Sequence, residues 1–225
     1  SGSVADSVVV AGLATADGLV ATEAAGVVSV AGLPYGITIR GALAADADRL
    51  TINGNEGDDS LKADDGVETT MLITLNGDDG NDLLIGGAGD DTMDGGAGDD
   101  TFVGNGGTDA IGGGVGSSVG DTILVQGTSG NDTISAALDG SGFLVVTVNG
   151  LTTTYTNFIG GPIATSGIER ILIEAGDGDD TISVAPIAGV NIVVNAGGPA
   201  ASDSMTITVP DNARVTQGAE STSGT

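Results

Sequence analysis

The chain has 225 residues, with 31 acidic and 5 basic side chains, a formal charge of -26 at pH 7, and no His or Cys. Without His and Cys it cannot build a zinc site, a haem or iron–sulfur ligand set, a cysteine nucleophile or a triad with a histidine base, and we expect no enzyme. The acidic excess also argues against nucleic acid as a partner, because that binding relies on Lys and Arg.

A folded core is nevertheless expected, because 40% of the residues are hydrophobic and the mean hydropathy is +0.25. Aromatic residues make up only 2% and glycines number 41, which favours thin layers of aliphatic side chains joined by tight turns. No apolar run is long enough to span a bilayer, and Ser1–Ser3 begin no leader pattern. We therefore expect a mature product or a fragment of an extracellular protein, secreted or on the cell surface.

Residues 1–47 contain three short β-rich runs: Val8–Val10, Val27–Val30 and Ile37–Ile39. They carry no repeated turn motif. We expect an amino-terminal group of strands that caps the fold or pairs with another subunit.

From residue 48 a loose unit recurs, in which two alternating apolar residues precede a polar turn and the pattern Gly-x-Asp-x-apolar. Its aspartates are Asp59, Asp82, Asp132 and Asp180, with a degenerate copy at Asp203. Steps of 23 residues separate Asp59 from Asp82, Asp109 from Asp132 and Asp180 from Asp203. The step of 48 from Asp132 to Asp180 equals two such lengths. The spacing predicts an all-β solenoid with coils of about 23 to 24 residues.

Residues 77–112 repeat with a period of nine. Gly occupies the fourth place (Gly80, Gly89, Gly98, Gly107), Asp the sixth (Asp82, Asp91, Asp100, Asp109) and an apolar residue the eighth (Leu84, Met93, Phe102, Ile111). Turn formation by Asp and Gly explains the composition, but not the fixed period.

This block resembles the G-G-x-G-x-D-x-U-x nonapeptide of RTX, or hemolysin-type, calcium-binding proteins. The resemblance implies a right-handed parallel β-roll in which two nonapeptides make one coil and Ca²⁺ ions lie between stacked turns. It also implies that Asp82 pairs with Asp100 and Asp91 with Asp109, with turn carbonyls completing the ligand shell. Asp78 and Asn105 replace the second Gly, so weaker binding is expected in the first and last copies.

Oxygen ligands also favour several Ca²⁺ ions on chemical grounds, since Mg²⁺ demands stricter octahedral geometry. The expected ligands include, besides the four aspartates of the nonapeptides, Asp59, Asp132, Asp180 and Asp203. Acidic side chains crowded into stacked turns repel one another, so we expect metal binding and folding to be coupled.

Asn149-Gly150 separates two β-rich runs and predicts a type I′ hairpin over 143–156, which decorates or replaces one coil. The expected organisation is therefore an amino-terminal unit 1–47, a calcium-binding β-roll 48–135 and a second solenoid half 136–225 with a calcium turn at 175–183.

We expect a calcium-stiffened module of a surface fibre, S-layer or adhesin. Strand-like segments near both ends, at Val8–Val10 and before Val215, suggest self-association into a filament or tandem array. The alternative is the carboxyl-terminal secretion and folding module of a larger RTX enzyme or toxin. Thr152–Thr154 is the one short candidate for a flat threonine row facing a cell-surface glycan or ice.

Overall fold

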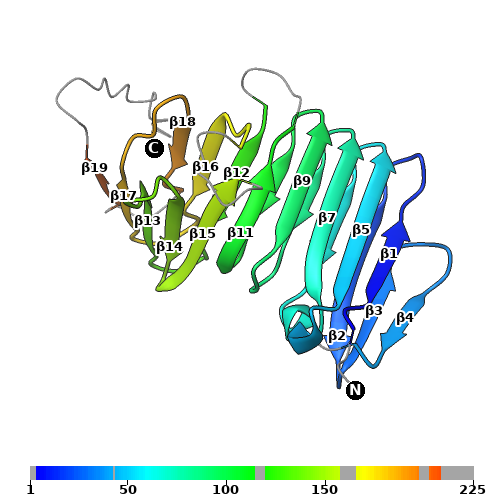
Figure 1. The fold of residues 1–225 in the computed structure, drawn as a ribbon. Coiled ribbons are helices and arrows are strands. Elements are labelled where there is room, and N and C mark those ends of the chain that lie inside the picture. Colours follow the sequence, from blue (N-terminus) through cyan, green and yellow to red (C-terminus); the bar gives the residue numbers. More distant parts are fainter. Residues whose placement is uncertain (1–3, 43, 115–119, 158–165, 198–202, 209–225) are drawn as a thin grey trace.

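The computed structural model describes residues 4–42, 44–114, 120–157, 166–197 and 203–208. They form nineteen β-strands and two 3-10 helices, η1 (Ala44–Asp46) and η2 (Val67–Thr69). The strands build two hydrogen-bonded sheets, which lie face to face along an elongated stack (Figure 1). The all-β prediction is confirmed.

Sheet A has ten strands. In spatial order they are β1 (Ser7–Ala11), β5 (Arg49–Glu56), β7 (Leu72–Asp79), β9 (Thr92–Ala97), β11 (Gly107–Gly112), β15 (Leu151–Asn157), β14 (Leu144–Val148), β13 (Thr133–Leu138), β17 (Thr181–Val184) and β19 (Ser204–Ile207). Sheet B has nine strands. In spatial order they are β18 (Asn191–Asn195), β16 (Arg170–Glu174), β12 (Thr122–Gln126), β10 (Thr101–Val103), β8 (Leu83–Ile85), β6 (Ser60–Ala63), β2 (Gly18–Ala24), β3 (Val27–Ala31) and β4 (Ile37–Arg40).

The chain alternates between the sheets, so that strands of successive coils pair in parallel at the predicted spacings. Ile52 pairs with Leu75 and Leu75 with Met93, at offsets of 23 and 18 residues. The eighth residue of each nonapeptide points into the core, and all four are fully buried: Leu84, Met93, Phe102 and Ile111. Two nonapeptides therefore make one coil, as the resemblance implies.

The hairpin is formed by β14 and β15, and Asn149 and Gly150 have φ angles of 53° and 88°, as a type I′ turn requires. It is inserted into sheet A alone, where β15 pairs in parallel with β11 and β14 antiparallel with β13. In sheet B, β12 pairs directly with β16. The 23-residue step from Asp109 to Asp132 therefore does not place these two residues side by side, because β15 and β14 lie between β11 and β13 in sheet A.

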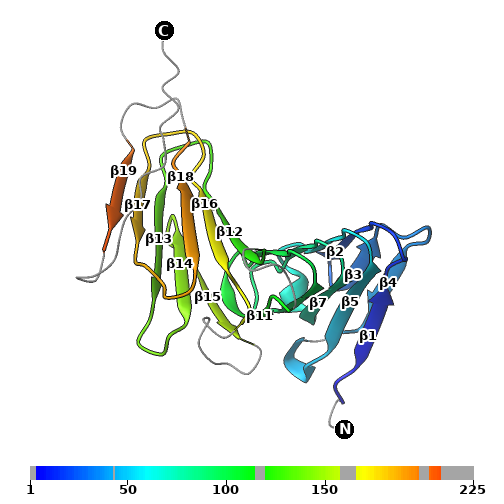
Figure 2. The ribbon, with the colours of Figure 1, turned by 90° about the horizontal axis from the view of Figure 1, so that it is seen from above.

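Two extra strands make sheet A the longer layer at this point, so the stack bends toward sheet B. Figure 2 shows the two halves meeting at an angle beside β11, β12 and β15. Alternation along β15 buries Thr153 and leaves Thr152 exposed, so Thr152–Thr154 does not form one flat row.

At the amino-terminal end, β2, β3 and β4 form an antiparallel meander that extends sheet B beyond β1. Val28 and Val30 of β3 are buried in the common core. Of the strand-like stretch before Val215, Ser204–Ile207 form β19, and residues 209–215 lie outside the described residues. Within the described part of the chain no helix has the length and apolarity that crossing a membrane requires.

Candidate metal centre

Acidic side chains line both edges of the stack, where the chain turns from one sheet to the other. On the edge that leads into sheet B, the backbone N–H of each acid donates to the side-chain carboxylate of the corresponding acid in the next coil. These acids, which we name the first ladder, are Asp17, Asp59, Asp82, Asp100, Asp121 and Glu169. Their N···O distances run from 2.7 to 3.0 Å, without a break.

The second ladder lies on the opposite edge, where turns lead into sheet A. It comprises three separate runs: Asp6 to Asp48, Asp91 to Asp109, and Asp132 through Asp180 to Asp203. Buried Met71 takes the place of an acid between the first two runs, where Leu72 N–H donates to the Asp48 carbonyl. The inserted hairpin separates the last two runs.

The structure thus brings together the pairs Asp82–Asp100 and Asp91–Asp109 that the RTX resemblance implies. It also places Asp132 beside Asp180 although 48 residues separate them, with an N···O distance of 2.8 Å. Asp59 contacts Asp82, and Asp180 contacts Asp203, at their predicted steps of 23.

The first glycine of the repeat is needed for space, because the Asp carboxylate five residues later lies against it. A Cβ on Gly77 would lie 2.1 Å from Asp82 Oδ2 and 2.5 Å from the carbonyl oxygen of Gly95 in the next coil. A Cβ on Gly54 would likewise lie 2.1 Å from Asp59 Oδ2 and 2.7 Å from the Gly77 carbonyl. At these two turns a carboxylate oxygen and a carbonyl oxygen of the next coil therefore come close to one point.

The second position of the repeat is instead left-handed, with φ angles of 95° at Gly87 and 100° at Gly96. Asp78 and Asn105, which replace glycine there, adopt 71° and 64°. Asp and Asn are the non-glycine residues that tolerate this conformation best, so both departures preserve the turn.

A ladder carboxylate that accepts the N–H of its neighbour uses one oxygen for it, and at five of these acids the other oxygen is buried and has no partner among the described residues. The side-chain oxygens without a hydrogen-bond partner among the described residues are Oδ2 of Asp59, Asp82, Asp100, Asp109 and Asp180, and both oxygens of Asp91. A buried anionic oxygen without a partner is costly, and a bound cation supplies that partner.

Burial is the main cause that raises the pKa of these carboxyls, to about 6 at Asp82, 7 at Asp100 and 8 at Asp91 and Asp109. Neighbouring carboxylates add to the shift: Asp59 and Asp58 act on Asp82, and Asp82 and Asp121 on Asp100. Burial also raises the pKa of Tyr155, whose hydroxyl therefore stays neutral.

Asp132 differs from the other members. Burial raises its pKa, but hydrogen bonds from the Thr128 backbone N–H, the Asn149 side chain and the Thr128 hydroxyl outweigh that effect and lower it. The Asp132 carboxylate thus accepts three protein donors, whereas the nonapeptide carboxylates accept one backbone N–H or, at Asp91, none.

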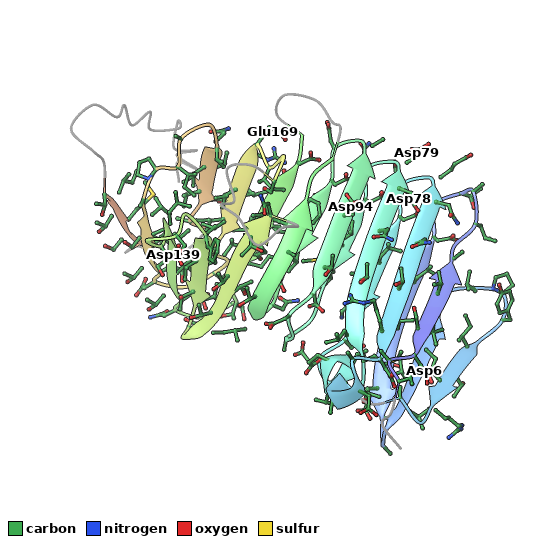
Figure 3. All side chains as sticks on the ribbon, in the orientation of Figure 1. Asp6, Asp78, Asp79, Asp94, Asp139 and Glu169 are labelled. Atoms are coloured by element: carbon green, nitrogen blue, oxygen red, sulfur yellow. The ribbon has the colours of Figure 1, made fainter. Side chains whose placement is uncertain are left out.

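The donor set fits a hard cation that binds carboxylate and carbonyl oxygens, which is the preference of Ca²⁺. Among the described residues no three acidic side chains converge on one point. The described residues therefore fit calcium sites that are formed by two carboxylates and by backbone carbonyls of the turns, as the resemblance also implies. Asp78, Asp79 and Asp94 lie outside the ladders, on β7 and β9 (Figure 3).

Sequence reasoning missed five acids that participate in the ladders: Asp17, Asp6, Asp48, Asp121 and Glu169. The first of these has a detectable signal, since Gly12 lies five residues before it and Leu19 two residues after it. A longer loop separates Gly113 from Asp121, and a Glu replaces Asp at position 169, so neither matches the nine-residue pattern.

The two parallel-stranded faces, the glycine turns and the stacked acids define a calcium-binding β-roll. The family model of the RTX calcium-binding nonapeptide repeat matches in four copies, over residues 51–69, 74–102, 88–119 and 124–138. The chain therefore carries RTX repeats, which bind Ca²⁺, and the resemblance found in its sequence is confirmed. Neither a curated protein nor a solved structure matches the chain.

Proposed function

We propose that the chain is an extracellular structural module of a surface fibre, S-layer or adhesin, which Ca²⁺ stiffens and which associates end to end. The observation that carries this proposal is the double row of buried, unpartnered carboxylate oxygens along the turns. The expected ligands are Asp59, Asp82, Asp91, Asp100, Asp109, Asp132, Asp180 and Asp203, with the carbonyls of the adjoining glycine turns. Asp17 and Asp121 join this set because they continue the first ladder.

Calcium would give such a module its stiffness, because each ion links two successive coils. RTX turns suit millimolar calcium, the range of extracellular modules with weak sites. An ion present at ten times its dissociation constant contributes about 1.4 kcal/mol to folding, so several ions together decide whether the stack is rigid.

End-to-end association is supported by the edges of the two sheets. At one end of the stack the outermost strands are β1 and β4, and at the other β18 and β19, each paired on one side only within the described ranges. Met205 on β19 is in register with buried Ile182 but is 48% exposed. Such an edge pairs readily with another strand.

Metal analysis and circular dichroism with thermal melting, each in EGTA and in millimolar CaCl₂, test calcium binding and its coupling to folding. Bound calcium and a higher melting temperature in calcium are expected, and equal melting in both buffers would refute stiffening. Sedimentation over a range of protein concentrations tests association separately. A monomer at high concentration in calcium would contradict the fibre and favour the secretion and folding module of a larger RTX enzyme or toxin.

A further inference from the structure

The inserted hairpin ends one run of the second ladder with a tyrosine. Asp91 is followed in the ladder by Asp109, and the strand beside Asp109 is β15 of the hairpin. In the sheet register the residue directly opposite Asp109 is Tyr155. Tyr155 therefore stands where a regular coil would present the next aspartate.

The hydroxyl of Tyr155 lies inside the turn and does not point to solvent. The side chain is 2% exposed, and its oxygen accepts the backbone N–H of Gly104 at 3.0 Å. A Cβ on Gly104 would lie 2.2 Å from Asp109 Oδ2 and 2.9 Å from the Tyr155 hydroxyl oxygen. Asp109 Oδ2 is itself buried and has no hydrogen-bond partner among the described residues.

The same arrangement recurs elsewhere with a backbone oxygen in the place of the tyrosine. Beside Gly12, Gly54 and Gly77, the second oxygen is the carbonyl of the first glycine in the next coil, Gly54, Gly77 and Gly95 respectively. Beside Gly127 it is the carbonyl of Ala175, which begins the corresponding turn. Beside Gly104, where the hairpin strand β15 replaces the next coil, a phenolic oxygen lies in that place.

We infer that Tyr155 is a calcium ligand that this chain adds to its RTX turns. At the last calcium position of this run, its hydroxyl oxygen binds the ion together with Asp109 and replaces the glycine carbonyl that a further coil would supply. The inference rests on calcium binding by the ladders. It also gives the hairpin a role, because the ion then ties β15 to the turn that contains Gly104. No side chain would fit at Gly104, because a Cβ there would also lie 2.5 Å from Thr153 Cγ2.

The chain offers a direct spectroscopic test, because it has two tyrosines and no tryptophan. Terbium(III), a luminescent substitute for Ca²⁺, emits strongly only when an excited aromatic ring lies beside it. Tyr35 is 63% exposed, lies between β3 and β4, and supplies a matched control. Excitation of the tyrosines should give strong terbium emission in the wild type and in Tyr35→Phe, and at least a fivefold weaker signal in Tyr155→Phe.

Emission reports proximity, so calcium binding by equilibrium dialysis must accompany it. Tyr155→Phe keeps the ring and removes only the hydroxyl, and we expect one site to weaken about tenfold while the others keep their affinity. Equal calcium stoichiometry and affinity in Tyr155→Phe and the wild type would overturn the inference, as would unchanged terbium emission. If the wild type bound no calcium at all, the proposed function itself would fail.

A second measurement keeps Tyr155 intact, so that its result does not depend on whether Tyr155→Phe folds correctly. In Tyr35→Phe, Tyr155 is the sole phenol, and its near-UV absorption should shift as calcium is added and then saturate. Absence of any shift, in a protein shown by dialysis to fill its sites, would count against the ligand role.

Discussion

Gly77→Ala should disrupt a calcium turn through one methyl group. Gly77 does not have a positive φ, so alanine suits its backbone, and any damage comes from contact with neighbouring atoms. The new Cβ would lie 2.1 Å from Asp82 Oδ2 and 2.5 Å from the Gly95 carbonyl oxygen. Asp82 cannot easily move away, because its other oxygen holds the N–H of Asp59 at 2.7 Å.

The expected loss has two parts. Forcing a methyl group into a packed site costs about 1–3 kcal/mol. Loss of one ion present at ten times its dissociation constant removes about 1.4 kcal/mol more. Since 1 kcal/mol shifts the melting temperature of a chain of this size by about 2–4 °C, the variant should melt roughly 5–18 °C lower in calcium.

Gly140→Ala is the matched control, because a Cβ there has no atom within 4 Å and the residue also lacks a positive φ. Its melting temperature should stay within about 2 °C of the wild type, as for most surface changes. The assay is thermal melting by circular dichroism, in calcium and in EGTA, with calcium counted by dialysis. Equal calcium-dependent stabilisation in Gly77→Ala and Gly140→Ala would refute the steric reasoning.

Other consequences concern charge, pH and the hairpin. In EGTA at pH 8, Asp109→Asn should raise the melting temperature because it removes a buried charge, and in calcium it should lower the melting temperature because it removes a ligand. The exposed Asp65→Asn should change neither melting temperature. A shift of the same sign in both buffers for Asp109→Asn would contradict this reasoning. In EGTA, the wild type should melt at a lower temperature at pH 8 than at pH 5. The folded carboxyls of Asp82, Asp91, Asp100 and Asp109 have raised pKa values, so between about pH 4 and 8 the folded state holds more protons than the unfolded state and loses stability as pH rises. Calcium should reverse this trend because it needs the deprotonated form, and the same pH slope with and without calcium would disprove the linkage. Asn149→Ala should destabilise the protein by about 1–3 kcal/mol in thermal or urea melts, since it strains the type I′ turn and removes a hydrogen bond to Asp132. Thr152→Ala, on the exposed face of the same hairpin, should destabilise it less.

Much of the site could be predicted because residues that become neighbours in the regular coils are separated by a fixed number of residues in the sequence. A nine-residue unit that alternates between two sheets places Asp82 beside Asp100 wherever the coils are regular. The hairpin could also be predicted from local sequence, since Asn149 and Gly150 both favour the left-handed conformation that a type I′ turn requires.

The neighbours of irregular coils could not be found in this way. Asp132 lies beside Asp180 only because the hairpin enlarges sheet A and leaves sheet B continuous, and residue spacing contains no information on which sheet absorbs an insertion. Asp121 and Glu169 join the first ladder across loops of unequal length, so their position depends on strand pairing in sheet B. Tyr155 is part of no repeat, and its place beside Gly104 follows from the register of β15 on β11.

The bend created by the hairpin has a geometric consequence for any assembly of this chain. A straight unit repeated head to tail gives a straight rod, but an angled unit repeated by the same operation gives a ring or a helix. Since sheet A is the outer layer of the bend and sheet B the inner one, successive copies would keep turning toward their sheet B side. A fibre of this protein would therefore have a curvature and a helical pitch set by two inserted strands, and shortening the hairpin would change the path of the whole filament.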